Sequence, residues 1–495
     1  MTLRNPVIAG APGDDHGDPF VIRYLDSYFL YHTGDTSGRR GVSVHRSDDL
    51  VHWEFRGYAL EAASSGWAWS DLWAPEVVYE RGMFYMYVSA TRALTGRRTG
   101  RWQTGAGDDA GRRLGLARAR NPEGPFVWDD EPLLDHWSID GHPFRDDDGS
   151  FWLFYNVRNE HTAYRDGTPG TGIVCDRLLG ADRLEGRPRP VVSPSQDWEG
   201  NRERDFYWNE APFVLPRRGM YHLMYSGGYF RDDTYAIGLA RWSRGDDAWL
   251  KRTDNPILVG SPRIRGPGHH SLVFGPDAAT RYAVYHGYVE GAAGRKVCLD
   301  RLRWGGDRPV IDGPTDEQPA PPPAVFDADV PHWAAELWAR GSWVEVCGRR
   351  FPLDPADVWH QVECEQTENR LSVRVGGILR GSRPVESGTG RPSFDAEGAL
   401  GPLTLTSCGV DAALHGLPRG STYAWAWGGR GPVEVSVAVR GAATVRIGAA
   451  TAASAESDAF AVLRLAGADG GDEIVVEAVD GGASVADLAV FARPT

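Results

Sequence analysis

Three carboxylate residues in the first half of this 495-residue chain stand in the same local context. Asp18 opens the segment DPFVI, Asp140 opens DGHPF and Glu210 opens EAPFVL. Proline or glycine follows each closely and an apolar run comes next, which predicts a position at the start of a β-strand. Inverting hydrolysis of a glycosidic bond needs a carboxylate to activate water and a carboxylic acid to protonate the leaving oxygen. The three residues together predict a glycosidase site, whereas any one alone would more simply cap a turn or face solvent.

These carboxylates belong to a pattern that occurs five times between residues 18 and 285. Each unit opens with Asp, Glu or His, continues as an apolar strand and a turn, and closes with an aromatic strand that contains tyrosine. The openers are Asp18, Glu76, Asp140, Glu210 and His269, and the tyrosines are Tyr31, Tyr87, Tyr155, Tyr225 and Tyr285. Successive tyrosines lie 56, 68, 70 and 60 residues apart, which is typical of propeller blades. We therefore predict an all-β, five-bladed β-propeller whose five openers meet near its axis.

A proline-rich stretch, DEQPAPPPA at 316–324, marks the clearest boundary in the chain. It divides the sequence into a propeller at 1–318, a linker at 319–324 and a C-terminal β-sandwich region at 325–495. Alternating segments such as VEVSVAVRG and DEIVVEAVDG indicate half-buried strands in the last region. The pattern leaves open whether this region is one sandwich or two modules, 325–405 and 410–495.

Composition limits the partners of the protein. The net charge of −14 argues against nucleic acid, which requires a basic surface. The sequence contains no apolar run of about 18 residues that could span a membrane. The N-terminal segment MTLRNPVIAG lacks the apolar core of a signal peptide, and the five scattered cysteines suit reduced thiols. We expect a cytoplasmic protein, or a secreted one if a signal has been removed.

Six motifs together resemble glycoside hydrolase family 43. They are HGDPF at 16–20, WAPEV at 73–77, IDGHPFRDDDGSFWLFY at 139–155, NEAPFVL at 209–215, GPGHHS at 266–271 and RKVCLDRL at 295–302. Each motif is weak alone, but the set is specific because it occurs in the family's order. The resemblance implies a five-bladed inverting enzyme that acts mostly on arabinose- and xylose-containing glycans.

The same resemblance implies roles for individual residues. It implies Asp18 as the general base, Glu210 as the general acid and Asp140 as a third carboxylate that orients the acid and tunes its pKa. It implies that Arg295 reaches the substrate, and it places His269 near the axis, as a substrate-binding residue and beside a structural calcium ion. Without the resemblance, His269 and His270 could be zinc ligands, but no matching Cys/His set stands near the pair in the sequence. A hard ion held largely by water, or no ion, fits better.

Trp73 is a further candidate for substrate binding, because an indole beside the axis can stack on a sugar ring. A tryptophan buried within its blade is nearly as good an interpretation. The reaction itself requires no cofactor.

We therefore predict an exo-acting, inverting α-L-arabinofuranosidase whose partner is a carbohydrate. A β-D-xylosidase or an arabinanase of the same family is the alternative, since loops decide between such similar sugars. A non-catalytic carbohydrate-binding propeller is the alternative from another class. The complete set of three carboxylates favours the enzyme, because a lectin has no use for an acid with a raised pKa.

Overall fold

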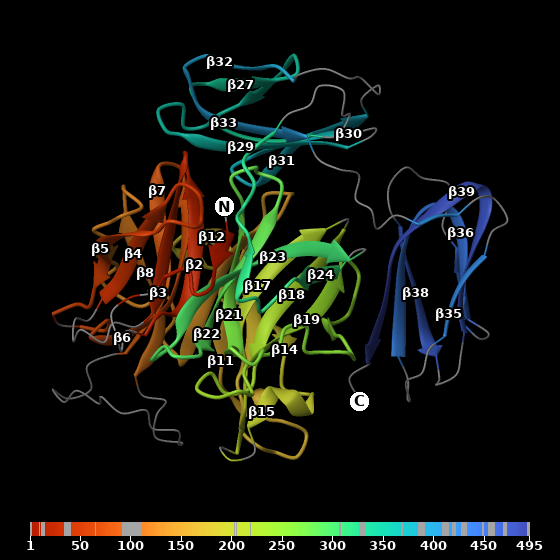
Figure 1. The fold of residues 1–495 in the computed structure, drawn as a ribbon, viewed down its shortest axis with the longest axis horizontal. Helices are drawn as coiled ribbons and strands as arrows, with labels where there is room; N and C mark the ends of the chain where they lie inside the picture. Colours follow the sequence, from red (N-terminus) through yellow and green to blue (C-terminus); the bar gives the residue numbers. More distant parts are fainter. Residues whose placement is uncertain are drawn as a thin grey trace.

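The computed structural model of the protein describes most of the chain. It describes residues 2–492 apart from 9, 11–14, 34–40, 65, 92–110, 202, 204, 218, 306–307, 326–332, 368–369, 385–391, 408–414, 418–421, 427–432, 448–449, 454–460 and 469–472. In the described part, almost all regular structure is β-strand (Figure 1). The two helices described there are single 3-10 turns, η2 (Glu160–Thr162) and η3 (Asp197–Glu199), and neither is long or apolar enough to cross a membrane.

Five antiparallel sheets of four or five strands form most of the described part of residues 17–311, which also contains a small sheet of β15 (Gly200–Asn201) and β16 (Phe206–Tyr207). The first contains β2 (Gly17–Tyr24), β3 (Ser27–Thr33), β4 (Gly41–Ser47) and β5 (Glu54–Glu61). The second contains β6 (Ser70–Glu80), β7 (Met83–Thr91), β8 (Arg112–Ala119) and β9 (Val127–Trp128). The third contains β10 (Ser138–Arg145), β11 (Phe151–Val157), β12 (Gly172–Gly180) and β13 (Arg183–Leu184), with β14 (Arg189–Val192) beside β12.

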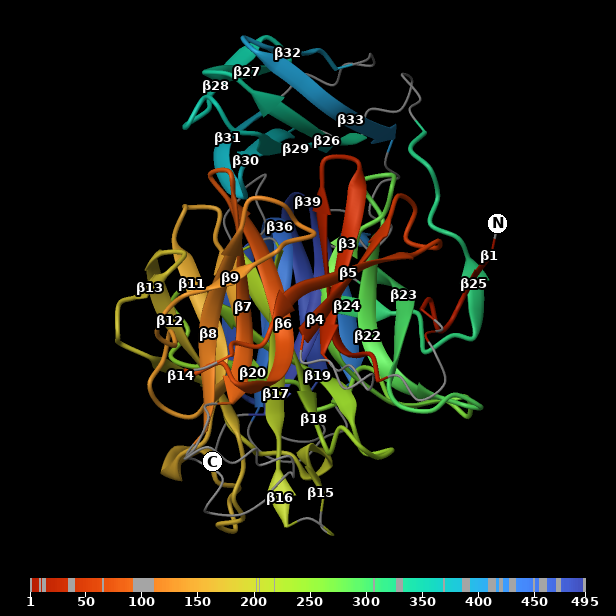
Figure 2. The same ribbon diagram turned by 90° about the vertical axis from the view of Figure 1, so that its left-hand side faces the viewer.

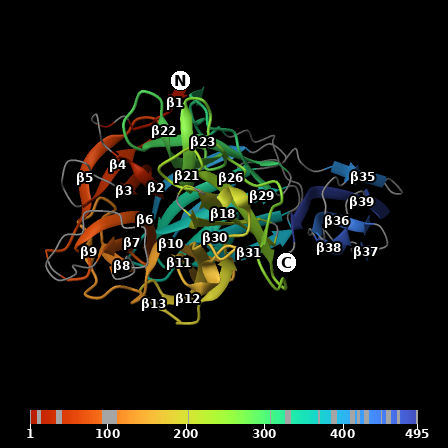
Figure 3. The ribbon, with the colours of Figure 1, turned by 90° about the horizontal axis from the view of Figure 1, so that it is seen from below.

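The remaining two sheets follow the same order of strands. The fourth contains β17 (Asn209–Arg217), β18 (Met220–Gly227), β19 (Ala236–Ser243) and β20 (Leu250–Lys251). The fifth contains β21 (Ile264–Phe274), β22 (Arg281–Val289), β23 (Lys296–Gly305) and β24 (Arg308–Ile311). The first strands contact one another in the order β2, β6, β10, β17 and β21, and β21 contacts β2 again. Seen from below, the sheets surround a common centre (Figure 3), and the predicted five-bladed propeller is confirmed.

A separate apolar core joins each pair of neighbouring blades, and the core between the fifth and first blades closes the ring. The closing core combines Leu3, Val21 and Leu30 with Val284 and Leu299. Outside the blades, β1 (Thr2–Arg4) pairs with β25 (Glu317–Pro319) and holds the two ends of the propeller together (Figure 2).

The repeat tyrosines explain why the pattern forms blades. All five are at most 1% exposed. Tyr31 donates its hydroxyl to the carbonyl of Pro122 at 2.5 Å, and Tyr87 donates to that of Ala181 at 2.6 Å. The phenols of Tyr31 and Tyr87 therefore fill cores between blades while their hydroxyls bind segments distant in the sequence, which satisfies these buried polar groups.

A β-sandwich follows the propeller. One sheet contains β26 (Trp333–Arg340), β29 (His360–Thr367), β30 (Arg370–Val375), β31 (Ile378–Pro384) and β33 (Ala399–Ser407). The other contains β27 (Trp343–Val346), β28 (Arg349–Pro352) and β32 (Phe394–Ala396), and one apolar core lies between the two sheets.

The sandwich packs on the hairpin ends of the inner strands (Figure 1). Arg23 pairs with the buried Glu336 at 3.1 Å, and Arg374 pairs with Asp147 at 2.7 Å. The hydroxyl of Tyr79 donates to the carbonyl of Trp359 at 2.9 Å. These contacts lie at the ends of β2, β6 and β10, whereas the carboxylates of interest lie near the beginnings of their strands. The sandwich therefore supports the propeller from the opposite side.

The last strands form a separate sheet. It contains β34 (His415–Leu417), β35 (Thr422–Ala426), β36 (Val433–Ile447), β37 (Ala450–Ala453), β38 (Ala461–Ala468) and β39 (Glu473–Ala492). Within the described ranges it shares no strand with the sandwich of residues 333–407. The sequence left open whether the C-terminal region is one sandwich or two modules. On the basis of these separate sheets we propose two modules.

Candidate active site

Every inner strand is interrupted by a β-bulge near its start. The register of pairing shifts between Gly17 and Phe20 in the first blade, and equivalent shifts occur in the other four. At each bulge one residue has a left-handed backbone: Asp18 (φ 52°), Ala74 (φ 49°), Asp140 (φ 57°), Ala211 (φ 53°) and His269 (φ 44°). Bulges re-aim side chains, and strain of this kind gathers at functional sites.

The bulges correct one detail of the predicted repeat. Asp18, Asp140 and His269 occupy the matched position, but Glu76 comes two residues after it and Glu210 one residue before it. The five openers are therefore not equivalent. One non-glycine residue with a left-handed backbone does not change the alternation of apolar and polar residues, so its position in the strand cannot be recognised from the sequence.

Polar partners hold each bulge through its backbone N–H group. Ala74 donates to Thr33 Oγ1 at 2.6 Å, Asp140 to Ser89 Oγ at 3.1 Å, and His269 to Ser226 Oγ at 2.8 Å. Each of these hydroxyls follows a repeat tyrosine by one or two residues. We missed these three hydroxyls in the sequence, although their position one or two residues after the tyrosines is a signal that could have found them.

Asp18 lies in a cationic environment. Its Oδ1 atom accepts a hydrogen bond from Arg295 Nη1 at 2.9 Å and lies 3.2 Å from His269 Nδ1. Burial alone would raise the pKa of Asp18, but the charge of Arg295, followed by that of His269, outweighs it and holds the pKa well below its ordinary value. Asp18 is therefore ionised throughout the neutral range.

Asp140 and Glu210 lie in the opposite kind of environment. The backbone N–H of Ala211, next to Glu210, donates to Asp140 Oδ2 at 3.1 Å, and Tyr235 donates its hydroxyl to Glu210 Oε1 at 2.8 Å. Burial is the largest cause in both, and it raises the pKa of Asp140 and that of Glu210 to about 7. For Asp140, the positive charge of His269 opposes this rise in the pKa, and the negative charges of Glu210 and Asp18 contribute to it. The site thus combines one permanently ionised carboxylate with two that hold protons near neutrality.

Arg295 is bound on both sides by carboxylates. Beside its bond to Asp18, its Nη2 atom contacts Asp15 Oδ2 at 2.6 Å, and its backbone N–H donates to Asp15 Oδ1 at 2.8 Å. Direct contact of Arg295 with substrate stays a prediction, whereas its pairing with Asp18 is observed. Asp15 was missed in the sequence, because nothing in its local pattern links it to a residue 280 positions away.

Trp73 and Glu76 also have partners in the structure. The guanidinium of Arg112 lies over the ring of Trp73, 4.6 Å from its centroid, so a sugar would have to stack on the other face. Glu76 accepts a hydrogen bond of 2.8 Å from His142 Nδ1. His142 Nε2 accepts the backbone N–H of Val214 at 3.1 Å, which fixes the tautomer and joins three blades.

The predicted calcium site near His269 has little support in the geometry. His269 is directed at Asp18, and the described residues include no group of three or more His, Cys, Asp or Glu that could hold a metal ion. Calcium prefers six to eight oxygen ligands, which these neighbours do not supply. A metal at this position stays a prediction, and no chemistry below depends on it.

The propeller region of the chain is similar to a known family of proteins. Residues 3–309 match the family described as glycosyl hydrolases family 43. The beta-D-galactofuranosidase xynD of Aspergillus niger is 26% identical over 321 residues, which cover 60% of this chain and 81% of that protein. The extracellular exo-alpha-(1->5)-L-arabinofuranosidase ArbA of Cellvibrio japonicus is 26% identical over 346 residues, which cover 61% of this chain and 88% of that protein.

A solved structure extends the likeness to the fold. It is described as a thermostable family-43 glycoside hydrolase and is 33% identical, with a TM-score of 0.55, covering 65% of this chain and 99% of that chain. The family match spans more than half of the chain and includes all five blades. The chain therefore belongs to family 43 of the glycosyl hydrolases and is a glycoside hydrolase.

Proposed function

We propose that the protein is an inverting, exo-acting α-L-arabinofuranosidase in which Asp18 is the general base and Glu210 the general acid. The observation that carries this proposal is the opposite direction of the two pKa shifts within one buried site. Catalysis of this type requires one carboxylate that stays ionised and one that keeps its proton, and pairs whose pKa values are driven apart identify the two roles.

The reaction follows from these protonation states. Asp18 accepts a proton from a water molecule whose oxygen attacks the anomeric carbon. The bond from that carbon to the leaving oxygen breaks, and Glu210 gives its proton to the leaving oxygen. Because Tyr235 donates to Oε1 of Glu210, the transferable proton is on Oε2. The proposed reaction uses only water and these two carboxyl groups, and it inverts the anomeric configuration.

The sugar is proposed from the relatives. Both of the proteins compared above have names that denote furanosidases, one for arabinofuranose and one for galactofuranose. Our first choice of substrate is therefore a furanoside, which the enzyme releases from the end of a chain. A β-D-xyloside, the alternative from the sequence, is our second choice. Release of arabinose from short imported oligosaccharides would fit the cytoplasmic location that we expect.

A panel of aryl glycosides tests the function. We expect the 4-nitrophenyl α-L-arabinofuranoside to be hydrolysed with a higher kcat/KM than the β-D-xyloside or the β-D-galactofuranoside, and polymeric arabinan to be cleaved slowly from its ends. Proton NMR of the first turnover should show the β anomer of arabinose, as inversion requires. If the protein bound these glycosides but hydrolysed none of them, the proposed enzyme activity would be wrong and the protein would be a carbohydrate-binding propeller.

The role proposed for Asp140 has a signature in the pH profile. The charge of Glu210 raises the pKa of Asp140. Because the repulsion between two charges is mutual, we expect Asp140→Asn to lower the pKa of Glu210. The acid then loses its proton earlier, and the alkaline limb of kcat/KM against pH should move to lower pH. An aryl arabinofuranoside measured between pH 4 and 9 would reveal the shift. An alkaline limb that stays in place or moves upward would contradict the assignment.

A further inference from the structure

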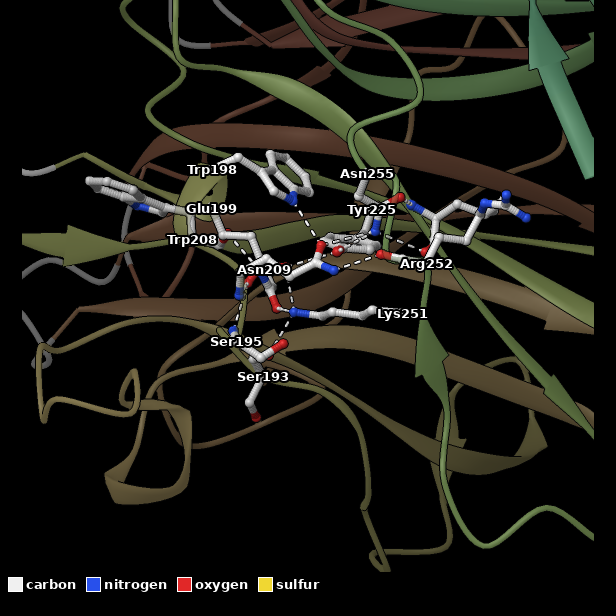
Figure 4. A network of polar contacts seen from close by, with 12 residues as sticks. Ser193, Ser195, Trp198, Glu199, Trp208, Asn209, Tyr225, Lys251, Arg252 and Asn255 are labelled. Carbon is white, nitrogen blue, oxygen red and sulfur yellow. Dashed lines mark hydrogen bonds and ion pairs between the residues drawn. The ribbon is translucent and has the colours of Figure 1, made fainter. Parts of the chain in front are cut away.

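A buried ion pair lies beside the strand that carries Glu210 (Figure 4). Lys251, at the end of β20, forms an ion pair with Oε1 of Glu199 in η3, and their side chains are 8% and 0% exposed. The Nζ atom of Lys251 also donates to Asn209 Oδ1 at 2.6 Å and to the carbonyl of Ser193 at 2.7 Å. The ammonium group thus donates to three acceptors, one for each of its protons.

Glu199 is equally well satisfied. Its Oε2 atom accepts the backbone N–H groups of Ser195 at 2.7 Å and Gln196 at 2.9 Å, and Oε1 also accepts the hydroxyl of Tyr225 at 2.8 Å. A buried charge persists only when it is paired and hydrogen-bonded, and a network of this kind fixes the geometry of its members. Asn209 is the member that adjoins the proposed acid.

Every polar group of Asn209 is bound. Its backbone N–H donates to Thr171 Oγ1 at 3.2 Å, its carbonyl accepts Asn156 Nδ2 at 2.5 Å, and its side-chain amide donates to the carbonyl of Trp208 at 2.7 Å. On the other side of Glu210, the left-handed Ala211 is tied to Asp140. The backbone of Glu210 is therefore held from both directions, and Lys251 supplies the charged contact on one of them.

The neighbouring blade shows what a purely structural version of this arrangement contains. Tyr285, the counterpart of Tyr225, donates its hydroxyl to Asp300, which is 0% exposed. The other donors to Asp300 are Thr315, with Oγ1 and with its backbone N–H at 3.2 Å, and Gln318 Nε2 at 2.9 Å, all of them neutral groups. A buried tyrosine–carboxylate contact beside an inner strand therefore needs no lysine, and the lysine occurs in the blade that carries Glu210.

We propose that Lys251 is a positioning residue for catalysis, which acts through Asn209 to hold the carboxyl group of Glu210 where the leaving oxygen is protonated. This inference rests on the proposed role of Glu210 as the acid. A displacement of about 1 Å in a reacting group can cost roughly 100-fold in rate. Loss of the contact between Lys251 and Asn209 should consequently impair proton donation by Glu210 without changing the affinity for the sugar.

Lys251→Met and Asn209→Ala in the full-length protein test the proposal. Both should lower kcat by roughly 10- to 100-fold on a substrate with a poor leaving group, such as a methyl or alkyl arabinofuranoside. The loss should be less than about threefold on the 2,4-dinitrophenyl arabinofuranoside, whose departure barely needs a proton, and KM should change little on either. Asn209→Ala leaves the ion pair intact, so it remains informative if Lys251→Met does not fold.

Two further proteins make the outcome decisive. Asp300→Asn is the matched control: it should lower the melting temperature and leave the ratio of the two activities unchanged. In a Glu210→Gln background, Lys251→Met should cause no additional loss on the poor leaving group, because the group that it positions is already absent.

If Glu210→Gln shows no dependence on the leaving group, the proposed acid is wrong. A second outcome would overturn only the positioning role of Lys251. In that outcome Glu210→Gln depends on the leaving group, but Lys251→Met and Asn209→Ala reduce the rates on the poor and the activated leaving group by the same factor.

Discussion

Replacement of Asp18 by asparagine is expected to reduce kcat/KM by about 1,000-fold or more on every substrate, whatever its leaving group. Asparagine has nearly the same shape but cannot accept a proton from water, and water must be activated in every turnover. Arg295 keeps its contacts with Asp15, so the arginine is not left without a counter-charge and the protein should fold. Initial rates on a 2,4-dinitrophenyl and an alkyl arabinofuranoside, side by side, measure the effect.

Substrate affinity is the control for Asp18→Asn. Isothermal titration with an arabino-oligosaccharide measures the dissociation constant of the variant. This constant should lie within a few-fold of the value for the wild-type protein, measured under conditions in which the wild-type protein does not turn over. A loss confined to poor leaving groups would mean that Asp18 donates the proton instead. A variant with near-normal rates would remove Asp18 from the chemistry altogether.

Glu210→Gln should have an effect nearly as large, but only where protonation is needed. Glutamine keeps a carbonyl oxygen that can accept the hydroxyl of Tyr235, yet it has no proton to transfer to the leaving oxygen. We expect a loss of about 100- to 10,000-fold on alkyl arabinofuranosides and less than about tenfold on the 2,4-dinitrophenyl substrate. The alkaline limb of the pH profile should also disappear for the activated substrate, because the titrating acid is gone.

The pH measurement separates this result from simple disruption of the site. A distorted site would keep the alkaline limb and slow both substrates alike. Equal losses on both leaving groups would therefore contradict the role of Glu210 as the acid, even if the variant were almost inactive.

Local sequence carried much of the fold and part of the site. The tyrosine repeat predicted five blades because all five tyrosines are buried in cores between blades, and a residue type that recurs in the same setting leaves a period in the sequence. Asp18, Asp140 and Glu210 were recognisable because strand starts have their own local pattern. Their exact alignment was not, since the bulge places Glu210 one residue before the left-handed position.

Contacts between distant segments could not be predicted in the same way. Asp15 meets Arg295 and Lys251 meets Glu199 only after the ring has brought their strands together, and no spacing along the chain encodes either pair. The contact between His269 and Asp18 was hidden by the same limit, and the role of His269 as a metal ligand stays a prediction. A buried carboxylate attracts cationic neighbours, and Asp18 supplies the partner that the sequence left unassigned.

The closure of the ring between β2 and β21 also determines when the propeller becomes complete during synthesis of the chain. Leu3, Val21 and Leu30 leave the ribosome first, but their partners Val284 and Leu299 follow more than 250 residues later. At about 5–20 residues per second, the first blade waits on the order of 10–60 s with one apolar face uncovered. Asp18 and His269 meet across that last seam. A nascent chain that stops before the fifth blade therefore lacks both its final core and a finished catalytic centre.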